Sequence, residues 1–259
     1  MSEFKQTFNS SLGKKLIMAL TGLFLCTFLI VHLGGNLLLF KHDDGFAFNM
    51  YANFLTHFPP IELVAYFLYL CILVHALYAL ILTIINRKAR PVGYAIQAKS
   101  DASWSSKNMG LLGAVLLLFI VIHMSDFWYR YKFGSSMTYK EYRTDLSSGI
   151  TQSVEFSPTS PDFENSVQTQ NNFEIVRVKD LHARVQESFG QLWYVIFYVI
   201  AMIAVSFHLL HGFQSAFRTL GWVHRKYTPI VEFIGTWFFA VIMPLGFAAM
   251  PVVYYFTKS

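Results

Sequence analysis

Five histidines lie inside long apolar stretches of the 259-residue sequence, a setting in which ionisable side chains are rare and usually functional. They are His32, His75, His123, His208 and His211. A single buried histidine is most often a core residue that bonds to a neighbouring helix. Four separate stretches that each supply a histidine indicate something else, because neutral imidazole is the usual axial ligand of a six-coordinate haem and each such haem needs two. The sequence therefore predicts two haems, each held by two histidines.

The stretches that carry these histidines are long enough to cross a membrane. Hydrophobic residues make up 54% of the chain and charged residues only 14%, against about 25% charged in soluble domains. Five apolar runs of about 20 residues or more can each span about 30 Å of hydrocarbon. Their expected ranges are 14–40, 61–85, 109–128, 191–217 and 229–256, and Pro244 should kink the last. We expect an all-α fold, a single bundle of five transmembrane helices over residues 1–259.

One connection, residues 131–190, is long, polar and mixed in charge. It contains a strand-like run from Phe173 to Val178 and a serine- and proline-rich stretch at 157–161. We expect it to be an external loop or a small insert between the third and fourth helices. Nothing in it suggests catalysis.

Lysines and arginines concentrate in the N-terminus, in residues 87–107 and in the turn at 218–226. With five spans these segments fall on one side of the membrane, and the positive-inside rule makes that side cytoplasmic. We therefore expect a cytoplasmic N-terminus and an external C-terminus. The net charge of +5 reflects these loops and not a nucleic-acid partner.

The depth of each histidine in the membrane predicts which two share a haem. His32 and His123 lie in outward-running spans, roughly 8–12 Å from the outer end at 1.5 Å per residue. His75 and His208 lie in inward-running spans, about ten and nine residues from the inner end. The first two should hold an outer haem and the last two an inner haem. His211, three residues after His208, faces a similar direction and stays an alternative ligand or a residue beside the haem propionates.

Two glycines agree with this arrangement. Gly22 and Gly113 each lie ten residues inward of an outer histidine, about 15 Å deeper and near the level of the inner haem. Their missing side chains would leave room for a macrocycle. Ordinary packing of small residues between helices is the alternative explanation.

Three segments resemble one family. They are the run from Ser11–Lys15 to His32–Asn36, the run from Asn49–Ala52 to Pro59, and the run from Phe207–Gly212 to Leu220–Gly221. The chain resembles the cytochrome b membrane anchor of succinate dehydrogenase and fumarate reductase, of the di-haem, five-helix, single-anchor type found in bacteria. The resemblance implies the same ligand pairs, with His208 as the fourth ligand. Ser206 departs from relatives that carry a glutamate there, which is assigned to transmembrane proton movement.

The resemblance also implies a location and partners. Such a subunit lies in the bacterial cytoplasmic membrane, anchors a flavoprotein and an iron–sulfur subunit on the cytoplasmic face, and passes electrons to or from menaquinone or a related quinone. That role belongs to respiratory complex II and the tricarboxylic acid cycle. The chain itself has no dinucleotide fingerprint, and its two cysteines, Cys26 and Cys71, make no cluster. Its partners must therefore supply the chemistry of succinate or fumarate.

A quinone site needs hydrogen-bonding groups and a proton carrier. The connection between the first two spans offers Asn49, Tyr51, His57 and Glu62, of which Glu62 is our preferred carrier. The alternative for Glu62 is an acidic residue favoured by the helix dipole. The cations expected near the inner haem propionates are Lys14, Lys15, Lys107 and Arg218, each of which could equally be a topology residue.

Two other functions stay open. The chain could anchor another quinone-linked dehydrogenase, such as a formate dehydrogenase or a hydrogenase, with the same haem ligands. Less favoured is a proton-coupled transporter that uses the histidines as proton relays.

Overall fold

The structure, a computed structural model, describes residues 10–89, 103–134, 137–156 and 167–258. Among them are five helices long and apolar enough to cross a membrane, which confirms the five expected spans. They are Ser11–Phe40, Pro59–Lys88, Met109–Phe133, Leu192–Thr219 and Thr228–Thr257. The largest difference from expectation is in the third, which ends at Phe133 instead of 128. Parts of the basic segment 87–107 and the stretch 157–161 lie outside the described residues.

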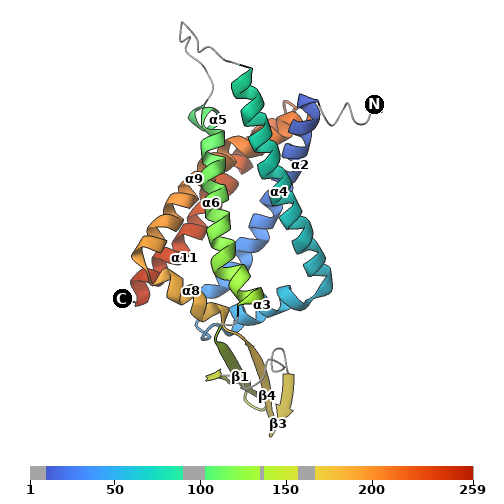
Figure 1. The fold of residues 1–259 in the computed structure, drawn as a ribbon. Coiled ribbons are helices and arrows are strands. Elements are labelled where there is room, and N and C mark those ends of the chain that lie inside the picture. The colour runs from blue at the N-terminus through green and yellow to red at the C-terminus, as the bar shows by residue number, and fades with distance from the viewer. Residues whose placement is uncertain (1–9, 90–102, 135–136, 157–166, 259) are drawn as a thin grey trace. The chain divides into compact units, whose positions relative to one another are not determined.

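Each span is built from named elements (Figure 1). The first two spans and the helix between them comprise α2 (Ser11–Asn36), the 3₁₀-helix η1 (Leu37–Phe40), α3 (Phe46–His57) and α4 (Pro59–Lys88). The short α5 (Trp104–Lys107) precedes the third span, which comprises α6 (Met109–His123), the π-helix η2 (Met124–Tyr129) and α7 (Arg130–Phe133). The last two spans are α9 (Leu192–Thr219) and the run of α10 (Thr228–Phe233), the π-helix η4 (Ile234–Ile242) and α11 (Met243–Lys258).

The all-α prediction was wrong in one region. The insert between the third and fourth spans forms a four-stranded antiparallel sheet in the order β2-β1-β4-β3. The strands are β1 (Tyr139–Asp145), β2 (Thr151–Phe156), β3 (Val167–Gln170) and β4 (Phe173–Lys179). The strand-like run expected from Phe173 to Val178 lies within β4, which confirms that expectation. The strand β1 was missed because its buried positions include Lys140 and Glu141, which do not resemble a hydrophobic core.

The sheet packs on α3. Tyr142 and Val178 are almost completely buried, and Phe46 and Met50 of α3 pack against them. A short helix, α8 (Leu181–Phe189), then leads back to the fourth span. Asp180 begins this helix, because its side chain accepts a hydrogen bond from the Ala183 N–H. The insert is thus a folded unit and not an irregular loop.

The chain divides into two compact units. Unit 1 consists of residues 1–31, 65–119 and 197–249, and unit 2 consists of residues 32–64, 120–196 and 250–259. His75, His208 and His211 belong to unit 1. His32 and His123 belong to unit 2, together with the insert. Each expected pair therefore lies within one unit.

The fifth span is irregular at Pro244, where a kink was expected. The π-helix η4 ends two residues before this proline. Proline has no N–H to donate to the carbonyl four residues earlier, which is that of Ala240. The hydroxyl of Ser206, in α9, donates to this Ala240 carbonyl instead. Ser206 therefore satisfies a backbone group that the proline leaves open.

Candidate functional site

The rings of His75 and His208 lie close together within unit 1. Their centroids lie 6.3 Å apart and their planes cross at 66°. Metal–imidazole bonds are about 2 Å long and a ring nitrogen lies about 1 Å from the ring centre, so two imidazoles on opposite sides of one ion have centres roughly 6 Å apart. The observed spacing fits one metal ion between the two rings.

The rings of His32 and His123 do the same within unit 2. Their centroids lie 5.8 Å apart and their planes cross at 87°. The two histidines come from α2 and from the last residue of α6. The two pairs thus use four different helices and have nearly the same spacing.

Each pair offers two ligands and no more. In the described part of the chain, no group of three or more His, Cys, Asp or Glu side chains could hold a metal ion. A protein-bound zinc or non-haem iron needs at least three such ligands. A haem needs only two, because its macrocycle supplies the other four. The donor sets therefore fit a haem and do not fit a bare metal ion.

Thr21 fixes the tautomer of His75. Its hydroxyl donates to the Ile17 carbonyl at 2.7 Å, so its oxygen is left to accept from His75 Nδ1 at 3.1 Å. A proton on Nδ1 leaves the lone pair on Nε2, the nitrogen needed for a metal. Such support of the far ring nitrogen is usual for metal-ligating histidine.

The partner ring has an open polar atom. Nδ1 of His208 is buried and has no hydrogen-bond partner. A buried polar atom without a partner costs about 1–3 kcal/mol, and a metal bound at Nε2 would leave this cost unchanged. The ring that lies against His75 is that of His208, and this contact favours His208 over His211 as the ligand.

The two glycines differ in what surrounds them. A Cβ on Gly22 would lie 3.2 Å from Cε1 of His75, whereas a Cβ on Gly113 would meet nothing within 4 Å. Gly22 therefore makes room for the imidazole ring. Gly113 faces open space, which is what a planar group would need.

The expected quinone residues lie in unit 2 and differ in their freedom to bind. Glu62, in the first turn of α4, makes an ion pair with Lys132 of α7, and both side chains are partly exposed. His57 is exposed at the end of α3, with Nδ1 2.8 Å from the Asn53 carbonyl. The ring of Tyr51 packs directly against Gly35 of α2, so closely that a Cβ at this glycine would overlap the ring.

Asn49 is fully buried, and its amide joins α3 to the insert. Its nitrogen donates to the Tyr142 hydroxyl at 2.9 Å and to Asp180 at 2.8 Å, and its oxygen accepts from the His182 N–H at 2.9 Å. Both amide hydrogens are therefore used within the protein. The geometry gives Asn49 a structural role, and its role toward a quinone stays a prediction.

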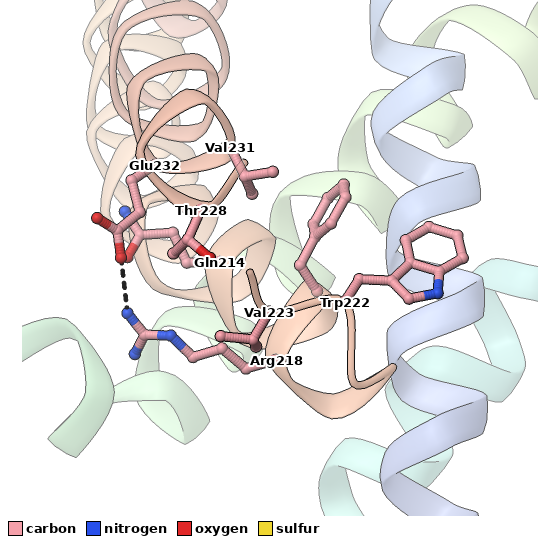
Figure 2. A pocket seen from close by; sticks show the side chains of 8 residues that line it. Gln214, Arg218, Trp222, Val223, Thr228, Val231 and Glu232 are labelled. Carbon is pink, nitrogen blue, oxygen red and sulfur yellow. Dashed lines mark hydrogen bonds and ion pairs between the residues drawn. The ribbon is translucent and has the colours of Figure 1, made fainter. Parts of the chain in front are cut away.

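The cations expected beside the inner propionates lie in unit 1. Arg218 reaches Glu232 at 3.0 Å, in a small hollow between α9 and α10 (Figure 2). Lys15 and Lys107 are exposed, and Lys14 is partly buried. Their roles toward a haem stay predictions.

A cluster of polar side chains around Asp126 was not expected from the sequence. This side chain lies in η2 and is only 14% exposed. It pairs with Arg184 and accepts hydrogen bonds from the Ser188 and Tyr194 hydroxyls, both at 2.9 Å. A signal for it existed, since Asp126 is the one acidic residue in the apolar run 109–128.

A second missed group ties the insert to the rest of unit 2. The buried His182 of α8 contacts the hydroxyl of Tyr254 at 3.0 Å, and that hydroxyl donates to the Leu39 carbonyl at 2.7 Å. Lys140 of β1 pairs with Asp44 at 2.8 Å. Burial raises the pKa of Asp44. The hydrogen bonds from Lys140 and Ser153 lower this pKa by more than burial raises it, so it lies below its ordinary value.

In comparisons with known proteins, no family model, no curated protein and no solved structure matches the chain.

Proposed function

We propose that the chain is the membrane anchor and electron-transfer subunit of a succinate:quinone oxidoreductase. It would carry electrons between an iron–sulfur subunit and a quinone through two b-type haems. One observation carries the di-haem part of the proposal, namely two histidine pairs from four spans, each with ring centres about 6 Å apart and no third ligand among the described residues. The link to succinate or fumarate rests on the resemblance of the sequence to that family of anchors.

The proposal gives each pair a place. With the N-terminus in the cytoplasm, His75 and His208 hold the haem nearer the cytoplasm, and His32 and His123 hold the haem nearer the outside. The bound haems would be the one-electron carriers. The residues of the chain orient the rings, as Thr21 does for His75, and exclude water from them.

The quinone site is proposed at the start of α4, where menaquinone or a related quinone would bind. Glu62 would hold or release the proton that accompanies each electron, and Lys132 would keep its carboxylate in place. Tyr51 and His57 belong to the same unit and stay candidate contacts. A flavoprotein and an iron–sulfur subunit would bind on the cytoplasmic face and supply the chemistry of succinate, since the sequence has no dinucleotide fingerprint and no cysteine cluster.

Purification from membranes tests the proposal. The chain should copurify with a flavin-carrying and an iron–sulfur subunit, and succinate should reduce its haems. The same two haems with a molybdenum- or nickel-containing partner would favour the anchor of a formate dehydrogenase or hydrogenase. A protein without b-type absorption would be left with the transporter function.

A further inference from the structure

Asp126 lies one turn after His123, yet the two side chains contact residues on different faces of the same span. Residues three apart on a regular α-helix point in similar directions. Here the helix changes to the π-form η2 directly after His123, and a π-turn is wider than an α-turn. The change lets His123 face His32 while Asp126 faces α8 and α9.

The partners of Asp126 come from three elements. Arg184 and Ser188 belong to α8, Tyr194 belongs to α9, and Arg130, at 3.4 Å, belongs to α7, which continues the same span. A charge this little exposed is stable only when it is paired and hydrogen-bonded. The carboxylate therefore fixes the last helix of the insert against the third span.

A row of aromatic rings connects α8 with His123, the candidate metal ligand. The ring of Phe127 lies 5.4 Å from that of His123, and the ring of Phe189 lies 6.2 Å from that of Phe127. Phe189, the last residue of α8, is 5% exposed. The insert thus supports the ring that contacts His123.

We propose that Asp126 is a positioning residue of the His32/His123 site. By holding α8 against η2 it keeps Phe127 in place, and Phe127 keeps the His123 imidazole nearly perpendicular to that of His32. The insert then has a function of its own, because it closes one side of this site and sets the angle between the two axial ligands. This inference rests on the proposed function, because it places a haem between the two rings.

The angle between axial imidazoles can be measured. Crossed ligand planes leave two iron d orbitals of a low-spin ferric haem nearly degenerate, which gives a strongly anisotropic electron paramagnetic resonance signal. The angles of 87° and 66° predict two signals, the more anisotropic one from His32/His123. The signal of the His75/His208 haem is an internal control.

The test uses Asp126→Asn in the intact complex. We expect two haems, a less anisotropic signal from the His32/His123 haem and an unchanged signal from the other. Asp126→Glu should restore most of the original signal. The matched control is Glu141→Gln, which removes a buried carboxylate of the insert, paired with Arg143 and Arg177, and should move neither signal.

Other outcomes decide as clearly. Two haems with both signals unchanged in Asp126→Asn would overturn the positioning role and leave the proposed function intact. Loss of the His32/His123 haem alone would support the role. If Asp126→Asn does not accumulate, the double variant Ser188→Ala with Tyr194→Phe removes two hydrogen bonds and keeps the ion pair, and an unchanged signal there overturns the role. Wild-type protein without haem would overturn both proposals.

Discussion

The two histidine pairs are nearly equal in spacing but different in surroundings. The His75/His208 pair lies in a unit whose elements are helices, and its nearest support is Thr21 and Gly22, neighbours on α2. The His32/His123 pair lies in the unit that contains α3, the sheet and α8. Its support reaches from Phe127 to the insert.

The difference shows two ways to position a pair of histidine rings within apolar helices. At the first pair, short contacts between spans fix a ring, so one side chain should matter a great deal locally. At the second, aromatic rings and a buried ion pair bring in residues from a folded insert. The support of this pair is shared among more residues, so we expect each single substitution there to have a smaller effect on the site.

The largest effect should come from the ligands themselves. His32→Ala and His75→Ala should each remove one haem, and a different one, as measured by spectra of the two redox states. Within the fourth span His208→Ala should remove the His75-side haem, whereas His211→Ala should keep both. The opposite result for the last two variants would make His211 the ligand.

The next effect concerns the quinone. Glu62→Gln should lower quinone-linked turnover by about 10²–10⁴-fold, the usual contribution of a general acid or base, while both haems stay bound. The measurement is succinate:quinone activity beside haem content. Normal turnover would leave Glu62 as a charged residue at a helix start.

A smaller effect should appear at the His75/His208 pair alone. Thr21→Val removes the acceptor for His75 Nδ1 and should weaken haem binding there by about 10–100-fold, as loss of such second contacts does at metal sites. Thr27→Val is the matched control, because Thr27 lies on the same helix, is exposed and donates to the Phe24 carbonyl. Equal haem retention in both variants would show that Thr21 does not support the ligand.

The smallest effect should be confined to the insert. Burial raises the pKa of Glu141, but the hydrogen bonds from Arg177 and Arg143 lower it more, so the pKa of the folded state lies below its ordinary value. The stabilisation is complete above the unfolded-state pKa and disappears as pH falls through the folded-state pKa. Acid should therefore open the sheet to proteases first, and Glu141→Gln should reduce that pH dependence. A variant as acid-sensitive as the wild type would contradict this.

The sequence predicted the spans well, since long apolar runs are signals that lie within short segments of the chain. The structure brings the rings of both expected histidine pairs close together, and their role as haem ligands stays a prediction. The sheet was not predictable in full, because β1 buries Lys140 and Glu141, whose partners lie far along the chain. The partners of the Asn49 amide were not predictable either, since Tyr142 and Asp180 come from the insert. Pairings between distant segments decide these positions, and one sequence does not display them.

The count of haems per chain tests the central claim most directly. Purified protein should give two b-type haems per chain by pyridine haemochrome. One haem or none per chain, in protein that is folded in detergent, would contradict the pairing of His32 with His123 and of His75 with His208.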